Sequence, residues 1–435
     1  MKILMVSHEY PPIGGGGANA CMHLAKEYAH AGHEVTIVTV WFAGQPEHES
    51  KDNIEIFRIK SKRKYAEHCG FAEMLDYLVK AMPITDKLER EKRFDVCQVF
   101  FGIPSGPIGY VLKKKYKLPY VIRFGGGDIP GFQDRFAFVY KAIGPAVKLM
   151  WKKADALVAN SEGLKKLAEG FYDKKEIKII PNGADVRAFS SENPNAVRSA
   201  EESGSAVKTT EISGSDVTLD AKCSDNTVHL LFVSRLIQRK GLQDILPQMS
   251  KVAKACAAKG VNVVFDIVGD GPFREELEKI VSEGANESVS IRNDSLEKTH
   301  EDIVSNADVN GLNLRNIVRF HGQKTKEELP PFYSEADLFL FPSRKEGMPN
   351  AVLEAMSYGL PILMTPCQGS DELIDGNGYV LAADDFGGKI VELCLDKSLR
   401  EKMGQRSTEL VKKKFSWGNT AKAYLELFDK ISKEV

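Results

Sequence analysis

Several features that would assign a protein class at once are missing from this 435-residue sequence. No apolar run reaches the roughly 18 residues expected of a membrane-spanning helix. The seven cysteines are scattered and form no CxxC pair, which argues against a disulfide framework or a structural zinc site. The formal net charge of -1 provides no overall field for nucleic acid. The first residues, KILMVS, are strand-like and carry no signal-peptide core, so we expect a cytoplasmic protein.

Two signatures of nucleotide chemistry are also absent. No DxD triplet occurs, so a metal-bound diphosphate is not indicated, and we expect neither a metal nor a cofactor. The glycine run at residues 14–17 does not continue as GxGxxG, because Asn19 stands at the third glycine position. The second predicted strand ends in TVW and lacks the acidic residue that binds a ribose in dinucleotide folds. These departures disfavour a nicotinamide-dependent enzyme.

What the sequence does contain is an alternation of short apolar strands and helix-length segments. Residues 2–7 and 34–40 read as strands, and residues 18–31 between them read as an amphipathic helix. This βαβ unit predicts a parallel sheet and an α/β fold. Further predicted strands cover residues 95–101, 119–124, 156–159, 177–180, 229–234, 262–268, 318–321, 338–341, 361–364 and 379–381.

The length predicts two doubly wound domains rather than one. We expect an N-terminal domain over residues 1–189, a polar linker or insertion over 190–227, and a second domain over 228–414. A further polar stretch, 282–314, reads as a surface excursion. Residues 415–435 carry an apolar stripe that favours a packed C-terminal helix over a ligand role, and we expect this helix to pack toward the first domain.

Three segments carry candidate chemistry. Gly14, Gly15, Gly16 and Gly17 lie between a strand and a helix, where backbone N–H groups can approach an anion, although a plain tight turn remains an alternative. Arg235 and Lys240 follow a strand and are able to clamp a diphosphate, the alternative being two solvated surface cations. The turn VGDGP, residues 268–272, reads as a structural turn beside a ligand crevice.

The most specific string is FPSRKEGMPNAVLEAMSYGLPI, residues 341–362. It predicts a strand ending at residue 341, a loop, and a helix over residues 351–358. Glu346 then lies on the loop and Glu354 on the helix behind it, so both carboxylates are able to face one cleft. The N–H groups at the start of this helix are suited to an anionic group.

Taken together and in order, these strings resemble the family-four retaining glycosyltransferases, which have the GT-B fold of two facing Rossmann-like domains with a cleft between them. The matching elements are HEYPPIGGGG, PNGAD at 181–185, VSRLIQRKG at 233–241, VGDGP, FHG at 320–322, and EGMPNAVLEAMSYGLPI at 346–362. They cover nearly the whole chain except the two polar segments. The resemblance implies transfer of a hexosyl group from a UDP- or GDP-sugar to an acceptor hydroxyl, in glycan or glycolipid synthesis.

The resemblance also implies residue roles. Arg235 and Lys240 would bind the diphosphate, Glu346 would lie near the donor sugar, and Glu354 would bind the ribose hydroxyls. Other implied donor-side residues are Gly16, Gly17, Gly269, Phe320, His321, Gly347, Met348, Pro349 and Asn350. On the acceptor side the implied residues are Gly14, Gly15 and Asp128. The segment RFGGGDIPG, residues 123–131, lacks the histidine that many relatives have, so Asp128 is expected to keep a polar role there.

The acceptor is expected to be a glycan, a lipid-linked sugar or a small molecule. Basic residues mixed with apolar ones suggest weak contact with the inner membrane face, the alternative being a solvated helix surface. These residues are Lys113, Lys114, Lys115, Lys117, Arg123, Lys148, Lys152 and Lys153, around Trp151. Other functions left open are a nucleotide-sugar epimerase of the same fold and a relative that binds a nucleotide sugar without catalysis.

Overall fold

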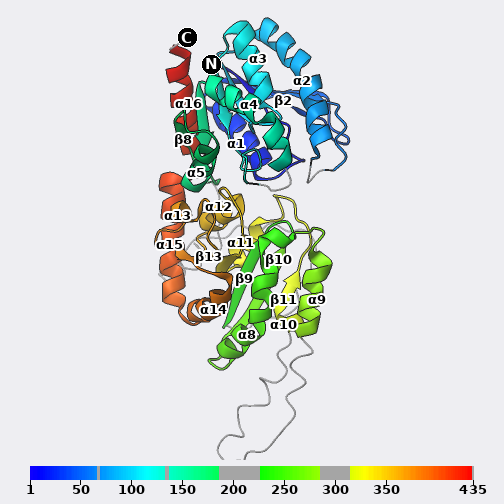
Figure 1. Cartoon of the computed structure of the whole chain (residues 1–435). Coiled ribbons are helices and arrows are strands. Elements are labelled where there is room, and N and C mark those ends of the chain that lie inside the picture. Colours follow the sequence, from blue (N-terminus) through cyan, green and yellow to red (C-terminus); the bar gives the residue numbers. More distant parts are fainter. Residues whose placement is uncertain (66–68, 133–136, 186–225, 285–313, 434–435) are drawn as a thin grey trace, which may run out of the picture. The chain divides into compact units, whose positions relative to one another are not determined.

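The strands of the chain pair into two separate, mainly parallel sheets (Figure 1). The computed structural model describes residues 1–65, 69–132, 137–185, 226–284 and 314–433. Unit 1 consists of Met1–Ala184, Glu346–Asn350 and Lys413–Val435, and unit 2 of Asp185–Lys345 and Ala351–Lys412. The predicted linker 190–227 and excursion 282–314 lie, apart from their ends, outside the described residues.

The sheet of unit 1 has the order β3-β4-β2-β1-β5-β6-β7-β8. All neighbouring strands pair in parallel except β3 and β4, which form an antiparallel edge. Most of these strands are buried along their length, as expected for a parallel sheet covered on both faces. Their bounds are β1 Lys2–Val6, β2 Glu34–Val40, β3 His48–Lys51, β4 Ile54–Ile59, β5 Val96–Phe100, β6 Tyr120–Arg123, β7 Ala156–Ala159 and β8 Ile177–Ile179.

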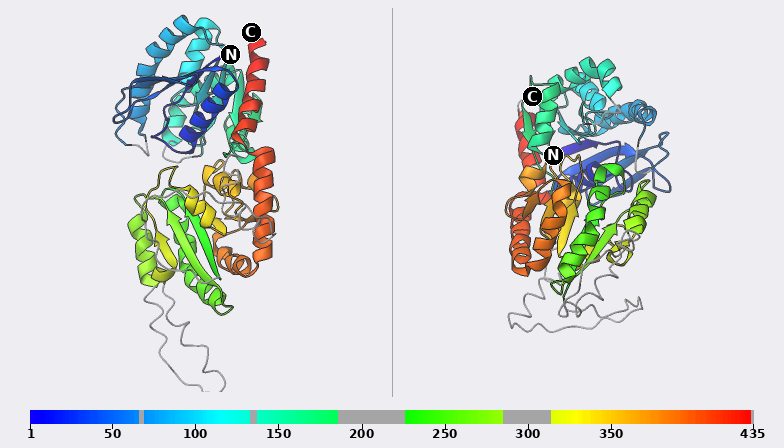
Figure 2. Two further views of the ribbon diagram at one scale, coloured as in Figure 1. Left: turned by 180° about the vertical axis from the view of Figure 1, so that it is seen from behind. Right: turned by 60° about the horizontal axis from the view of Figure 1, so that its bottom comes forward.

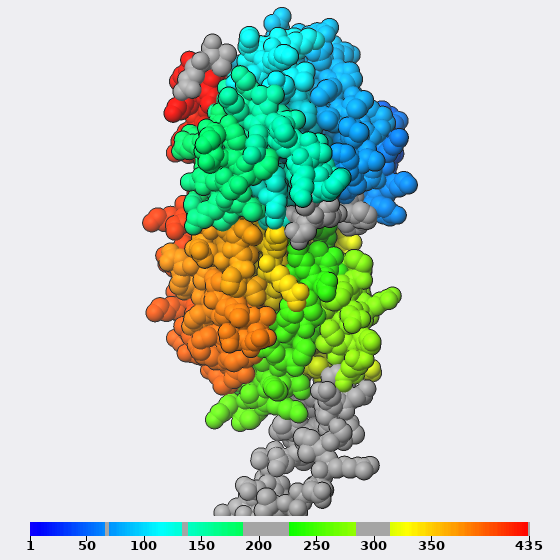
Figure 3. Space-filling model, in the orientation of Figure 1, coloured from blue at the N-terminus to red at the C-terminus, as the bar shows by residue number. Residues whose placement is uncertain are grey.

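Helices cover both faces of this sheet. On one face lie α1 (Gly16–His30) and α16 (Trp417–Lys433), side by side in Figures 1 and 2. The C-terminal helix is held there by buried residues at helical spacing, including Trp417, Tyr424 and Phe428. The other face is covered by α2 (Phe71–Lys92), α3 (Gly106–Tyr116), α4 (Ala137–Lys153) and α5 (Glu162–Phe171). Helices α3 and α4 form much of the face of unit 1 seen in Figure 3.

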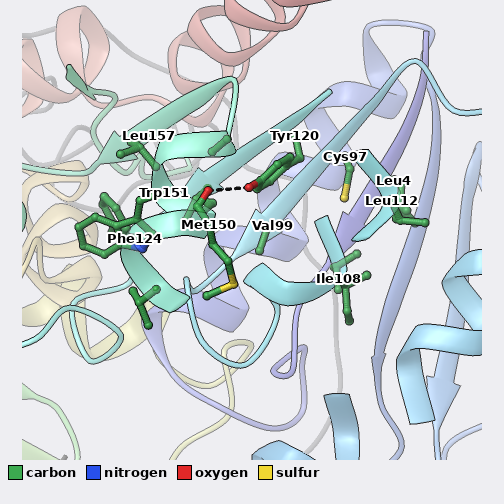
Figure 4. Close-up of a cluster of buried hydrophobic side chains, with 14 of the residues drawn as sticks. Leu4, Cys97, Val99, Ile108, Leu112, Tyr120, Phe124, Met150, Trp151 and Leu157 are labelled. Atoms are coloured by element: carbon green, nitrogen blue, oxygen red, sulfur yellow. Dashed lines mark hydrogen bonds between the residues drawn. The ribbon is translucent and has the colours of Figure 1, made fainter. Parts of the chain in front are cut away.

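The core beneath α3 and α4 is rich in large side chains (Figure 4). Trp151 is fully buried, and its ring lies 4.5 Å from that of Phe124. The hydroxyl of Tyr120 donates to the carbonyl oxygen of Met150 at 2.6 Å, so its polar end is satisfied inside the core. This packing fixes the ends of β6 and β7, where polar residues of the candidate site begin.

Unit 2 has a fully parallel six-stranded sheet of order β11-β10-β9-β12-β13-β14. The strands are β9 Thr227–Val233, β10 Asn262–Val268, β11 Val318–Phe320, β12 Leu338–Phe341, β13 Ile362–Met364 and β14 Gly378–Val380. The α-helices are α7 Leu242–Ile245, α8 Met249–Ala257, α9 Arg274–Gly284, α10 Leu314–Ile317, α11 Pro330–Glu335, α12 Asn350–Ser357, α13 Ser370–Leu373, α14 Phe386–Leu395 and α15 Lys397–Lys414. Short 3-10 helices are η3 Gln238–Lys240, η4 Leu246–Gln248 and η7 Ala383–Asp385. The predicted α/β class with two doubly wound sheets is confirmed.

Candidate functional site

The carboxyl ends of β9, β10 and β11 in unit 2 are joined backbone to backbone. Leu236 N donates to the carbonyl oxygen of Asp270 at 2.8 Å, and Gly269 N donates to that of Gly322 at 2.8 Å. A Cβ on Gly269 would lie 1.9 Å from the carbonyl oxygen of Ser234. Gly269 is therefore required for this close packing, and three loops converge at the sheet edge where doubly wound folds bind ligands.

The two predicted cations lie on one of these loops. Arg235 follows β9 and is exposed, whereas Lys240, the last residue of η3, is only 8% exposed. The Lys240 ammonium lies 5.2 Å from the centroid of the Phe341 ring at the end of β12. A buried ammonium against an aromatic face is not the solvated surface cation that was the alternative for Lys240.

Glu354 lies on α12 of unit 2, and its Oε2 accepts a hydrogen bond from the Tyr333 hydroxyl at 3.0 Å. Burial raises the pKa of this carboxyl, although Lys326 and the Tyr333 hydrogen bond act in the opposite direction. Glu346 belongs to the segment that is part of unit 1. The two glutamates that the sequence pairs are thus contributed by different units.

Phe320 ends β11, and the next residue, His321, has a carboxylate partner that the sequence did not suggest. His321 Nε2 lies 2.7 Å from Asp266 Oδ1, and His229 Nδ1 lies 3.4 Å from Asp266 Oδ2. Burial alone would raise the pKa of Asp266, but the hydrogen bonds of the two imidazoles lower it to about 2. The same carboxylate raises the pKa of His229. The FHG segment is therefore held by a hydrogen-bonded network centred on the Asp266 carboxylate of β10.

In unit 1 the glycine run is partly helical. Gly14 has φ +90°, and a Cβ there would lie 2.6 Å from Glu9 Oε2. Gly15 is the N-cap of α1, so the helix starts at Gly16, two residues earlier than predicted. A Cβ on Gly17 would lie 2.3 Å from the ring of Phe101, which itself has φ +69° at the end of β5. Close packing thus requires glycine at positions 14 and 17.

Segment 346–350 packs against the carboxyl ends of β7 and β8 within unit 1. Asn182 Nδ2, just after β8, donates to Asn350 Oδ1 at 2.8 Å and to the carbonyl oxygen of Met348 at 3.3 Å. Asn350 Nδ2 donates in turn to the carbonyl oxygen of Gly16 at 3.2 Å. A Cβ on Gly347 would lie 3.2 Å from Oδ1 of the buried Asn160, which follows β7.

One expectation for residues 347–350 needs correction, and the structure defines the polar contacts of Asp128. Residues 347–350 cannot all offer backbone N–H groups, because Pro349 has none. Asp128 is 4% exposed, and its carboxylate accepts from Gly102 N at 2.6 Å and Gly125 N at 2.8 Å. Both carboxylate oxygens therefore tie the loops after β5 and β6 together, which is a structural role.

The predicted basic surface is also altered by burial. Trp151 is fully buried (Figure 4). Arg123 is 2% exposed, so neither residue is available to a membrane. Lys113 pairs with Asp155 at 2.6 Å, and Lys115 pairs with Asp86 at 2.6 Å. Over the described ranges, no helix is long and apolar enough to cross a membrane, and no three His, Cys, Asp or Glu side chains gather as a metal site.

Both halves of the chain match models of glycosyltransferase families. Residues 14–188 match Glycosyltransferase Family 4, and residues 227–396 match Glycosyl transferases group 1. An uncharacterized glycosyltransferase of Methanocaldococcus jannaschii is 25% identical over 448 residues, covering 100% of this chain and 99% of that protein.

Solved structures with the same fold cover the whole chain. Sucrose-phosphate synthase from Thermosynechococcus elongatus has a TM-score of 0.73 at 17% identity, with 100% of each chain covered. Anabaena HepE, solved in complex with UDP and glucose, has a TM-score of 0.65 at 16% identity, with 99% of each chain covered. The two doubly wound sheets, the motifs in their order and the matches to both family models lead to one conclusion: the chain is a glycosyltransferase of the family 4/group 1 type with the GT-B fold.

Proposed function

We propose that this glycosyltransferase transfers a hexosyl group from a UDP- or GDP-sugar to an acceptor hydroxyl with retention of the anomeric configuration. The C1–oxygen bond of the donor breaks, and the leaving nucleoside diphosphate takes the electron pair. The acceptor oxygen forms the new bond to C1 and releases its proton. Retention follows from the resemblance to the family, and a UDP donor is supported by the fold shared with HepE, which was solved with UDP and glucose.

The observation that carries this proposal is the loop after β9, which holds both Arg235 and Lys240 at the carboxyl edge of the unit 2 sheet. A guanidinium and an ammonium placed there would stabilise the charge that develops on the departing diphosphate. Glu354 on α12 would bind the ribose hydroxyls, and Glu346 would lie near the transferred sugar. We propose that no metal ion or organic cofactor takes part, since the sequence has no DxD triplet.

The test is nucleotide release from a panel of UDP-, GDP- and ADP-hexoses, first without and then with acceptor sugars. We expect Arg235→Ala and Lys240→Ala to lower turnover about a hundredfold each, the effect of about 3 kcal/mol of lost transition-state stabilisation. Lys251→Ala, an exposed cation on α8 of the same unit, is the matched control and keeps wild-type turnover. EDTA leaves the rate unchanged. Equal activity of all three variants would refute the assignment.

The same assay separates the other functions. A binding protein without catalysis shifts its melting temperature with a nucleotide sugar but releases no nucleotide. An epimerase converts the donor into an isomer without releasing nucleotide. The match of Arg235, Lys240 and Glu354 to the donor-site motifs of the glycosyltransferase family favours the transferase over both.

For the acceptor we propose a glycan, lipid-linked or small-molecule hydroxyl, and we propose weak contact of α4 with anionic lipid. Phe138 is 83% exposed and Leu149 is 43% exposed on this helix, beside exposed Lys148 and Lys152. Such a mixture of apolar and basic side chains suits an anionic bilayer surface.

Co-sedimentation with anionic vesicles at low salt tests this contact. Phe138→Asp should lower the bound fraction, whereas Leu395→Asp, at an exposed apolar position of unit 2, should not. Absence of wild-type binding to anionic vesicles ends the membrane proposal and leaves soluble acceptors.

A further inference from the structure

We propose that Asn182 is a positioning residue that holds segment 346–350 in its working geometry, and that the buried Arg123 fixes the direction in which Asn182 points its amide. This inference rests on the proposed function and on the family resemblance, which implies that residues 347–350 contact the donor. It gives a role to the PNGAD string, residues 181–185, which the proposed reaction does not otherwise use.

Asn182 is 3% exposed and makes three contacts to the segment. Its side-chain Nδ2 donates to Asn350 Oδ1 and to the Met348 carbonyl oxygen, and its backbone N–H lies 3.3 Å from Met348 Sδ. These contacts bridge residues that are 168 and 166 positions apart in the sequence. One buried amide thus holds both the loop and the first residue of α12.

The direction of these hydrogen bonds starts from Arg123. This residue ends β6, is 2% exposed, and donates from Nη2 to Asn182 Oδ1. A guanidinium has donors and no acceptor, so the oxygen of Asn182 must face Arg123 and its NH₂ group must face the segment. Asn350 then presents its own oxygen to Asn182, and its NH₂ group is left for the Gly16 carbonyl oxygen. A single buried cation therefore orients two amides in series.

The environment of Arg123 indicates that its charge serves more than packing. Among the described residues, no carboxylate lies within ion-pair distance of Arg123. Its neighbours include the Phe100 ring, with the guanidinium carbon 5.2 Å from the ring centroid, and the buried Tyr424 hydroxyl, on which the guanidinium acts to lower the pKa against the effect of burial. The Nε of Arg123 is buried and has no hydrogen-bond partner among the residues that the structure describes. A buried cation without a carboxylate costs stability unless hydrogen bonds offset that cost, and the described hydrogen bond of the Arg123 guanidinium is the one to Asn182.

The geometry of the donor-contact segment would depend on this series of hydrogen bonds. Gly347, Met348 and Asn350 carry the N–H groups at the start of α12, where helix N-termini favour anions. Catalytic groups must be held to within about 1 Å, and a misplacement of that size costs about a hundredfold in rate. Loss of the Asn182 donor should release the segment on one side while the rest of unit 1 stays packed.

Asn182→Asp is the sharpest test, because Asp accepts from Arg123 but cannot donate to Met348 or Asn350. The new ion pair with Arg123 should keep or raise the melting temperature, whereas kcat/KM for the UDP- or GDP-hexose most active with the wild-type chain should fall 10- to 100-fold. Asn182→Ala should show a similar loss. A purely structural role predicts that activity follows stability, so that Asn182→Asp retains turnover.

Thr420→Val is the matched control. Thr420 Oγ1 donates to the Pro181 carbonyl oxygen at 3.0 Å, so this variant removes a hydrogen bond from the same turn without touching segment 346–350. Wild-type turnover for Asn182→Asp, or an equal loss for Asn182→Ala and Thr420→Val, overturns the inference.

A double-mutant cycle adds a readout that does not depend on one variant folding well. Asn350→Ala removes the shared Asn182–Asn350 hydrogen bond from the other side, so the double variant should lose less activity than the sum of the two single losses. Additive losses contradict the inference. Failure of the proposed function has a different signature: the wild-type chain and Arg235→Ala release nucleotide equally poorly, before any Asn182 variant is compared.

Discussion

Gly241 connects backbone conformation to the candidate diphosphate site, and its replacement by alanine gives a prediction that the structure makes quantitative. Gly241 follows Lys240 directly and has φ +75°. A Cβ at this position would lie 1.9 Å from the carbonyl oxygen of Pro342 and 2.9 Å from its carbonyl carbon. Gly260 has nearly the same φ, +73°, but a Cβ there would meet no atom within 4 Å. The pair therefore separates the cost of the left-handed backbone from the cost of the clash.

The backbone cost alone is about 1–2 kcal/mol for an alanine in the left-handed region. Gly260→Ala should lower the free energy of unfolding by this amount. In Gly241→Ala the loop must also move by about 1.3 Å or more to restore van der Waals separation, which adds about 1–3 kcal/mol of overpacking. Because the moving loop carries Lys240, Gly241→Ala should also lose most of its nucleotide release, whereas Gly260→Ala should keep it.

Both glycines lie in unit 2, so chemical and thermal unfolding of the two variants report on the same transition. Each kcal/mol corresponds to about 2–4 °C in melting temperature for a domain of 150–250 residues. Turnover is measured on the same preparations at a temperature where both variants are folded. Equal melting temperatures and equal turnover for the two variants would refute the reasoning from the clash with Pro342.

Two further predictions concern partly buried carboxylates in unit 2. The pKa of Asp266 is lowered from 3.8 to about 2, so its contribution of about 2 kcal/mol is present above pH 4 and is lost as pH falls toward 2. The pKa of His229 is raised from 6.5, so the stability that its protonated form contributes is fully present below pH 6.5. This stability is lost as the pH rises through the folded-state pKa of His229. Asp266→Asn should therefore destabilise most between pH 4 and 6.5 in urea unfolding; a pH-independent loss contradicts the network. Burial raises the pKa of Glu354, so ionisation costs stability as pH rises through that value. Glu354→Gln should be at least as stable as wild type at pH 8 yet lose the melting-temperature shift given by UDP or GDP, and retention of that shift would exclude a ribose-binding role.

Local sequence patterns were enough for most of the sheet framework. The strands predicted at residues 34–40, 156–159, 262–268 and 338–341 have these same bounds in the structure, because short apolar runs between turns are typical of strands buried on both faces. The antiparallel edge of β3 and β4 was missed. All four residues of β3 are exposed, so burial imposes no apolar signal on that strand.

Motifs whose residues are all close in the sequence could also be located from the sequence alone. Arg235 and Lys240 are five residues apart after a predicted strand, and the structure places both on the loop after β9, where the rule that ligands bind at carboxyl ends of parallel strands predicts a site. The apolar residues within 415–435 recur at helical spacing, which predicts an amphipathic helix. In the structure, α16 packs its apolar face on the sheet of unit 1.

Burial and long-range pairing were decided only by the tertiary structure. The sequence places Arg123 and Trp151 beside exposed lysines, yet the fold buries both. The carboxylate of Asp128 accepts hydrogen bonds from two backbone N–H groups. A local pattern cannot specify which distant residue will be the hydrogen-bond partner of a buried polar group. Buried polar groups require a partner, but the tertiary structure decides which donor or acceptor lies within reach. The sequence by itself determined two parallel sheets and the loops that carry the motifs. Only the folded chain joined Gly16, Asn182 and Asn350, up to 334 residues apart, through a direction of hydrogen bonding set by one buried arginine.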